Sequence, residues 1–149
     1  MKKILFAVAL SLAAVAAHAS ADSGTRFLSD LADKQVLTMN NHLLKQVDSS
    51  GCIVTFYWGE RSWVELDFSD VAAIENINNN VIVVHGPVNG HHEVPYIDSN
   101  TWKDSSESER FSISKLGFRS SVGSFVPDIE RAVRSIASDC GAKVPHFTE

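Results

Sequence analysis

The chain has 149 residues, with 13 Lys and Arg against 18 Asp and Glu, and a formal net charge of −5. Nucleic acids and anionic lipids are bound through clustered cations, so this charge argues against both as partners. The length is typical of one domain, and no repeat or low-complexity tract divides the sequence.

The N-terminal stretch MKKILFAVALSLAAVAAHASA has the pattern of a secretory signal peptide, with two lysines, an apolar run and then small residues. The apolar run is shorter than the roughly 20 residues that span a membrane. We therefore expect cleavage after Ala19 or Ala21, a signal peptide over residues 1–19, and a single secreted α+β domain over residues 20–149. The mature product would be periplasmic or secreted, with no membrane span. Its 11 basic and 18 acidic residues give a formal net charge of −7.

The first predicted element of this domain is one helix over residues 25–47. Apolar residues recur there at spacings close to the helical period, and Gly51 follows as a stop. A break within residues 37–41 is the alternative. Because the remaining positions are polar, we expect this helix to lie on the surface of a sheet.

A β-hairpin is predicted over residues 52–68, and the alternation of its residues sets the register. A three-residue loop, Gly59-Glu60-Arg61, places the apolar residues on one face. That face carries Cys52, Val54, Phe56, Val64, Leu66 and Phe68. The other face pairs Ile53 with Asp67, Thr55 with Glu65, and Tyr57 with Trp63.

The middle of the chain predicts short strands separated by polar segments. Residues 69–77 fit either a short helix or a bent strand, and 78–80 fit a turn. We expect a buried strand at 81–84, a loop at 85–92, an edge strand at 93–97 and a polar loop at 98–109. Residues 110–114 and 117–125 are further strand candidates.

The last predicted element is a helix that begins at Pro127 and ends before Gly141. Its apolar stripe includes Cys140, and Cys52 lies on the apolar face of the hairpin. An even number of cysteines in an oxidising compartment favours a disulfide. We therefore predict a Cys52–Cys140 bond that contributes roughly 3 to 4.7 kcal/mol in the chain-entropy model. Two separate buried thiols are the alternative.

These elements predict an α+β fold class. We expect an antiparallel sheet of about five strands, with the N-terminal helix and the C-terminal helix packed on it and one disulfide.

The hairpin supplies the candidate binding residues, which are Tyr57, Trp58, Arg61 and Trp63. Tyrosine and tryptophan are enriched at interfaces because they bury a large area and keep a polar tip. The alternative is that the N-terminal helix covers the face of Tyr57 and Trp63 and buries both rings.

A metal site is a second candidate, with His85, His91 and Glu93 as ligands in a glycine-rich stretch. Imidazole and carboxylate groups bind zinc and copper. The spacing matches no established ligand pattern, however, and adjacent His91 and His92 would point to opposite sides of an extended backbone. A solvated loop is therefore the alternative. No cofactor-binding pattern occurs, and we expect no cofactor.

Catalytic spacing is absent from the sequence. There is no nucleophile elbow, and Ser112 and Lys115 fit a Ser-x-x-Lys pattern only by letter. Glu65 and Asp67 alternate on the outer face beside Trp63, an arrangement suited to sugar binding or to acid–base chemistry. Charged residues that keep a sheet face in water are the alternative.

We therefore expect a non-catalytic interaction module, such as an inhibitor or immunity-type protein that binds a protein of the cell envelope or a toxin. Its acidity suits a basic partner. The alternatives are a periplasmic hydrolase that uses His or paired carboxylates, and a metal-binding protein that uses the histidine loop over residues 85–93.

Overall fold

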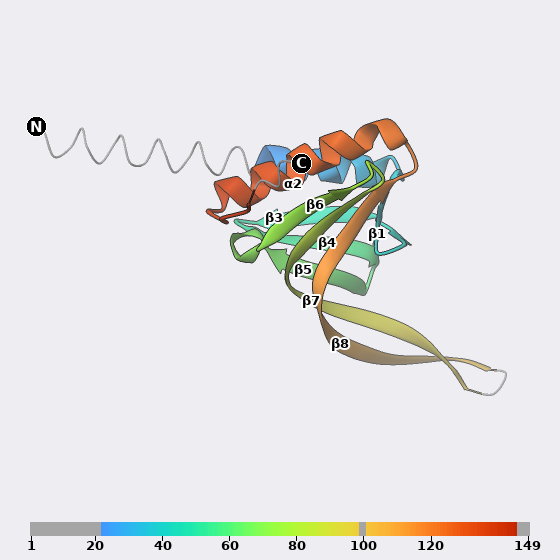
Figure 1. Ribbon diagram of the computed structural model, residues 1–149. Coiled ribbons are helices and arrows are strands. Elements are labelled where there is room, and N and C mark those ends of the chain that lie inside the picture. The colour runs from blue at the N-terminus through green and yellow to red at the C-terminus, as the bar shows by residue number, and fades with distance from the viewer. Residues whose placement is uncertain (1–21, 99–100, 146–149) are drawn as a thin grey trace, which may run out of the picture.

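The computed structural model describes residues 22–98 and 101–145, in which two α-helices cover one face of an antiparallel sheet (Figure 1). The sheet has eight strands rather than about five, in the order β2-β1-β8-β7-β5-β4-β3, with β6 also paired to β7. The first helix runs over residues 22–33. The strands are β1 (Leu37–Met39), β2 (His42–Leu43), β3 (Gln46–Ser50), β4 (Ile53–Gly59), β5 (Ser62–Asp67), β6 (Ala73–Ile77), β7 (Val81–Asp98) and β8 (Thr101–Ser120). The remaining helices are η1 (Phe68–Asp70), η2 (Gly123–Phe125) and α2 (Val126–Asp139).

The region after residue 33 corrects the prediction of one helix over residues 25–47. The chain there forms β1, β2 and β3. Asn40 and Asn41 both have positive φ angles, 49° and 68°, and form the two-residue loop that joins β1 to β2. Leu37 and Met39 are buried by the alternation of a strand, although their spacing from neighbouring apolar residues also fits a helix.

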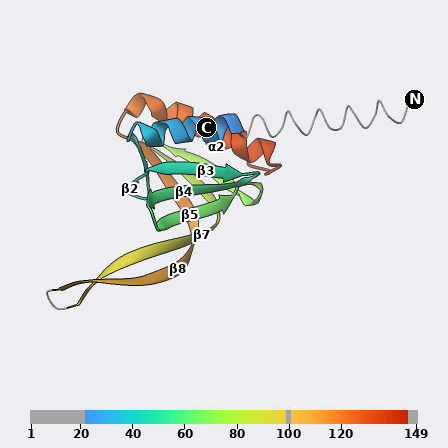
Figure 2. The ribbon, with the colours of Figure 1, turned by 180° about the vertical axis from the view of Figure 1, so that it is seen from behind.

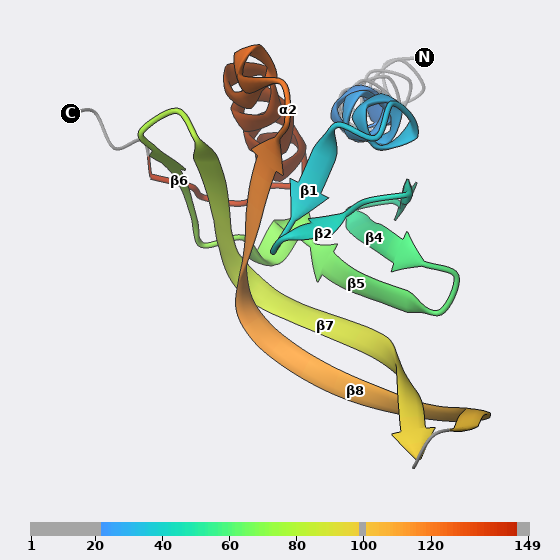
Figure 3. The ribbon, with the colours of Figure 1, turned by 90° about the vertical axis from the view of Figure 1, so that its right-hand side faces the viewer.

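The sheet curls, and a short segment of the chain joins the strands at its two ends. β2 and β3 stand at opposite ends of the strand order, yet only Leu44 and Lys45 separate them. The N–H of Leu44 donates to the carbonyl of Leu37 at 3.0 Å, and the N–H of Lys45 donates to the carbonyl of Tyr57 at 2.8 Å. This short segment therefore bonds to both ends of the sheet, and Figure 3 shows the resulting curved profile.

The hairpin of β4 and β5 has the predicted register. Val54 faces Leu66, Phe56 faces Val64, and Tyr57 faces Trp63. The predicted three-residue loop is wrong in detail, because Gly59 pairs with Ser62 and the register shifts between Tyr57 and Gly59. Trp58 is thus an extra residue on β4, a bulge that turns its side chain away from the regular alternation.

The long strands β7 and β8 replace several predicted short elements. Residues 69–77 form η1 and then β6, so the strand alternative is correct for 73–77. The predicted loops at 85–92 and 98–109 are wrong, because these segments belong largely to β7 and β8. The register shifts between His85 and Val88, where the glycine and proline of the sequence favour a loop.

The two strands also extend past the rest of the sheet. β5 pairs with β7 only as far as His91, whereas β7 and β8 stay paired with each other to Asp98 and Thr101. This two-stranded extension projects away from the body of the molecule (Figures 1 and 3). We call residues 93–98 and 101–109 the arm.

The helices close the core, and the predicted C-terminal helix is confirmed. Pro127 lies in the first turn of α2, and the buried stripe of α2 includes Ile129, Val133 and Ile136. The predicted disulfide is also present, because Cys140 is bonded to Cys52 with a Cα–Cα distance of 5.7 Å. It ties the end of α2 to the start of the β4–β5 hairpin. No helix in the described part of the chain has the length and apolar character of a membrane span.

Candidate functional site

The four predicted binding residues lie on two surfaces rather than one. Tyr57 and Trp63 are cross-strand partners on the outer face of the sheet, opposite the face that the helices cover. Both rings are partly buried, but the N-terminal helix does not cover them. Trp58 and Arg61 lie instead at the end of the β4–β5 hairpin, Trp58 at the bulge and Arg61 in the turn.

Strands β3, β4, β5, β7 and β8 are neighbours in the sheet (Figure 2). Their outer face carries two ordered rows of side chains. Residues that are direct cross-strand partners share a face of the sheet. Successive cross-strand partners form a first row of Gln46, Tyr57, Trp63, His91 and Arg110. We call it the ring row, because its three central members carry rings. The adjacent polar row consists of Asp48, Thr55, Glu65, Asn89 and Ser112.

His91 holds a fixed place beside Trp63. The two rings stack with centroids 5.8 Å apart and planes 14° from parallel. Nδ1 of His91 lies 2.8 Å from the carbonyl oxygen of Arg61, which can only accept a hydrogen bond, so Nδ1 carries the proton. The hydrogen bond fixes the orientation of the imidazole and leaves its Nε2 available to other groups.

A hollow of about 520 Å³ lies over this part of the outer face. Its polar wall includes Glu65, Asn89 and Arg110, and Trp63 and His91 supply planar rings. The hydroxyl of Ser112 donates to Oδ1 of Asn89 at 3.2 Å. This hydrogen bond orients the side-chain amide of Asn89.

Trp58 forms a second cluster at the hairpin end. Its indole stacks on His42 with centroids 4.9 Å apart and planes 19° from parallel, and His92 approaches it at 5.9 Å. We call His42, Trp58 and His92 the Trp58 cluster. His92 immediately precedes the arm, so the cluster lies at the base of that extension.

Histidine residues of the predicted metal site are not brought together. Nε2 of His85 contacts Oε2 of Glu75 at 2.6 Å, whereas His91 stacks on Trp63. The two histidines are six residues apart on β7, up to ~20 Å along an extended strand. The side chain of Glu93 lies outside the described residues. Within the described part, no three His, Cys, Asp or Glu side chains are grouped to hold a metal ion.

The groups suited to catalysis are likewise engaged or buried. The hydroxyl of Ser62 lies 3.4 Å from Nδ1 of His92, but Ser62 is only 8% exposed. Asp67 caps η1, since its Oδ1 accepts hydrogen bonds from the amide of Ser69 at 3.0 Å and from the Ser69 hydroxyl at 2.6 Å. This leaves Glu65 as the carboxylate of that pair facing the hollow.

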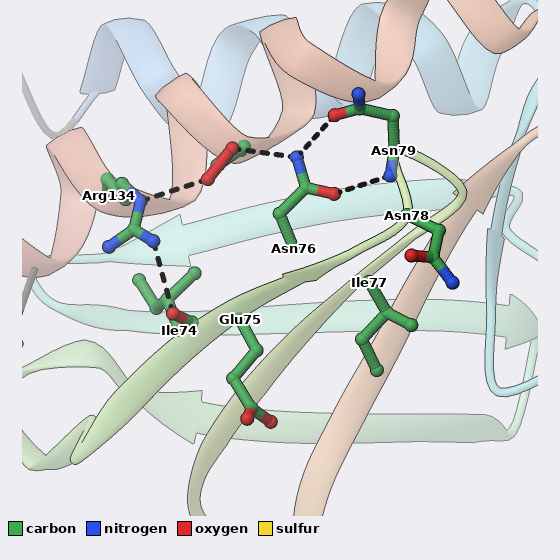
Figure 4. Close-up of a pocket in the computed structure, with 8 residues that line it drawn as sticks. Ile74, Glu75, Asn76, Ile77, Asn78, Asn79 and Arg134 are labelled. Carbon is green, nitrogen blue, oxygen red and sulfur yellow. Dashed lines mark hydrogen bonds and ion pairs between the residues drawn. The ribbon is translucent and has the colours of Figure 1, made fainter. Parts of the chain in front are cut away.

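A further polar hollow, of about 620 Å³, lies between the β6–β7 turn and α2 (Figure 4). Its amides and charges bind one another. Nδ2 of Asn76 donates to Glu130 at 2.9 Å, and Arg134 donates to Glu130 at 3.2 Å and to the carbonyl of Ile74 at 3.1 Å. We assign this network a structural role, because it joins the turn to α2 and leaves its central groups satisfied.

Comparison with protein-family models, with curated proteins and with solved structures finds no match to this chain. The candidate surfaces therefore rest on geometry alone. Sequence reasoning identified their tryptophans but missed His42, His92 and Asn89 as their neighbours. The sequence pattern places His42 in a helix, and it places His92 and Asn89 in a loop. The Asn40-Asn41 pair is the turn signal that corrects the prediction for His42.

Proposed function

We propose that the chain is a small non-catalytic interaction module that binds a protein of the cell envelope or a toxin. The single observation that carries this proposal is the position of the Trp58 cluster at the base of an arm whose strand edges are open. A secretory signal peptide over residues 1–19 and a periplasmic or extracellular location remain part of the proposal. The disulfide supports an oxidising compartment.

The arm favours a protein partner over a small molecule. Within residues 22–98 and 101–145, no strand pairs with β7 on its β5 side past His91, and β8 pairs with β1 only from Phe118 to Ser120. The backbone N–H and C=O groups along those edges are thus available to a further strand. An extended peptide supplies the matching backbone groups, as in recognition by strand addition.

The Trp58 cluster adds a side-chain anchor beside these edges. Trp58 is partly buried, and it contacts the imidazoles of His42 and His92 and packs against the core. A restrained aromatic ring loses little conformational freedom when a partner covers it, which is the property of interface hot spots.

The two alternatives have less support. A hydrolase would need an accessible nucleophile or a free pair of carboxylates, whereas Ser62 is buried and Asp67 caps η1. A metal-binding role through the histidine segment would need ligands that converge, whereas His85 and His91 contact different neighbours.

The test is affinity capture with the mature chain, residues 20–149, from the envelope fraction and culture supernatant of the source organism. We expect a stoichiometric protein partner that the wild type and Trp63→Ala retain and Trp58→Ala loses. Thermal unfolding and a Trp58→Phe variant control for misfolding. The proposal is abandoned if no stoichiometric protein is captured, and its assigned surface is wrong if Trp58→Ala captures the partner as well as the wild type does.

A further inference from the structure

We propose that the hollow on the outer face of the sheet is a saccharide-binding site, with Trp63 as its apolar platform and Glu65, Asn89 and Arg110 as its hydrogen-bonding groups. The site lies over β5, β7 and β8. It is separate from the Trp58 cluster, so this inference goes beyond the proposed protein partner and does not depend on it.

The first argument is the arrangement of planar groups. Tyr57, Trp63, His91 and Arg110 follow one another as cross-strand partners on four adjacent strands. Neighbouring strands lie about 4.8 Å apart, so the row places three rings and one guanidinium next to one another across these strands. A sugar ring has an apolar C–H face that packs against an aromatic surface, and Trp63 is the largest such surface in the hollow.

The second argument is that the carboxylate of Glu65 and the amide N–H groups of Asn89 keep hydrogen-bonding capacity for a ligand. Glu65 is partly buried, yet its carboxylate has no hydrogen-bond or ion-pair partner among the described residues. Asn89 accepts from Ser112 through Oδ1 and keeps both N–H donors free within the described part of the chain. A ligand hydroxyl can donate to the carboxylate of Glu65 in place of solvent.

The third argument is the match between these groups and neighbouring hydroxyls. The carboxylate of Glu65 only accepts, whereas the amide nitrogen of Asn89 and the guanidinium of Arg110 only donate. Glu65 and Asn89 are direct cross-strand partners, so an acceptor stands beside a donor. Adjacent sugar hydroxyls each donate and accept, and they can bind both groups at once.

Charge argues against nucleic acid as the ligand of this surface. Nucleic-acid bases use such platforms, but their phosphates require a basic groove. Here the polar row carries Asp48 and Glu65, and the whole chain has a net charge of −5. An uncharged polyol fits this surface, and a phosphodiester does not.

The test is isothermal titration calorimetry of the mature chain with chitotetraose, cellotetraose and maltotetraose, three neutral oligosaccharides that differ in linkage and substituents. We expect the wild type to bind at least one of them. Trp63→Ala and Glu65→Gln should each weaken that binding about tenfold or more, as expected when one stacking or charged contact is lost. Trp58→Ala is the matched control and should bind the saccharide with unchanged affinity.

Three results would overturn the assignment. The first is no binding of any of the three probes at millimolar concentration by the folded wild type. The second is binding that Trp63→Ala and Glu65→Gln leave unchanged, with folding verified by circular dichroism. The third is loss of the captured protein in Trp63→Ala together with no saccharide binding, which would make the outer face a protein contact. Only failure of the capture experiment itself would remove the proposed protein partner.

Discussion

Asn40 and Gly117 are hydrogen-bonded to each other in both directions. The N–H of Asn40 donates to the carbonyl of Gly117 at 2.9 Å, and the N–H of Gly117 donates to the side-chain Oδ1 of Asn40 at 2.7 Å. Asn40 also has a φ of 49° in the turn between β1 and β2. One residue therefore closes a hairpin and fixes it to β8.

Replacing Asn40 separates these two roles. Asn40→Ala loses the acceptor for Gly117 and puts alanine, which tolerates the left-handed region less well than asparagine, at this φ, so we expect a loss of about 2 to 3 kcal/mol in the free energy of unfolding. Asn40→Gly loses only the acceptor and should be destabilised by about 1 kcal/mol. Urea denaturation compares the two. Equal losses in both variants would show that the backbone angle is not a factor.

Removing the disulfide should lower stability without changing the fold. The Cys52→Ala, Cys140→Ala double variant loses a cross-link between residues 88 apart, and we expect a loss of about 2 to 5 kcal/mol. The double variant avoids leaving a lone thiol. Intact mass of the unfolded wild type should show two hydrogens fewer than the reduced chain. Two labelled thiols in unreduced wild-type protein would contradict the bond.

Trp63 and Phe56 provide a matched comparison of the two faces of the hairpin. Phe56 is fully buried and its ring contacts that of Phe118 with centroids 5.1 Å apart, so Phe56→Ala should lose about 3 to 5 kcal/mol. Trp63 lies on the uncovered face and keeps part of its surface in water, so Trp63→Ala should lose roughly 1 kcal/mol. Chemical denaturation measures both. Similar losses would mean that Trp63 is covered in solution.

Gly24 marks the closest approach of the two helices. A Cβ built there would lie 2.7 Å from Cγ1 of Ile136 and 3.0 Å from the carbonyl of Ala132. Gly24→Val should therefore push α2 away from the first helix and lose about 1 to 3 kcal/mol. Gly123→Val is the control, because nothing lies within 4 Å of its Cβ position. Its stability should change by roughly 0.5 kcal/mol or less, and a shift as large as that of Gly24→Val would rule out helix contact as the cause.

The parts of the fold that followed from sequence are those in which one pattern has one interpretation. Alternation in the hairpin fixed the pairing of Phe56 with Val64, because a slip of one residue would bury charges. The same argument placed Cys52 toward the core, and the stripe of α2 placed Cys140 there. The alternation of the hairpin and the helical period of α2 therefore each place one cysteine toward the core, where the two can bond.

The parts that did not follow have patterns with two interpretations. Leu37, Met39 and Leu44 suit both a helical stripe and short alternating strands, and only the left-handed angles at Asn40 and Asn41 decide between them. In β7, glycine and proline at the register shift resemble a loop. In the arm, the edge strand predicted at 93–97 is part of β7, whereas residues 101–109 are mostly polar and carry no apolar alternation that would predict a strand.

Prediction of the candidate site had the same limit. The pairing of Tyr57 with Trp63 is local to one hairpin, and parity was sufficient to find it. The neighbours of Trp58 and Trp63 come from β2, β7 and β8. Their positions depend on how distant strands align. Trp58 is among the predicted binding residues, but it packs against the core and contacts His42, away from the face on which Tyr57 and Trp63 lie.

The disulfide also determines what proteolysis can do to this molecule. Cys52 and Cys140 enclose every residue between them, which includes the arm and both candidate surfaces apart from His42 and the β3 residues. A protease that cuts the arm would open the chain but release no fragment, because the two pieces would stay joined through sulfur. A nicked molecule would run as one species on a non-reducing gel and as two after reduction, and its body could keep its fold and its binding surfaces.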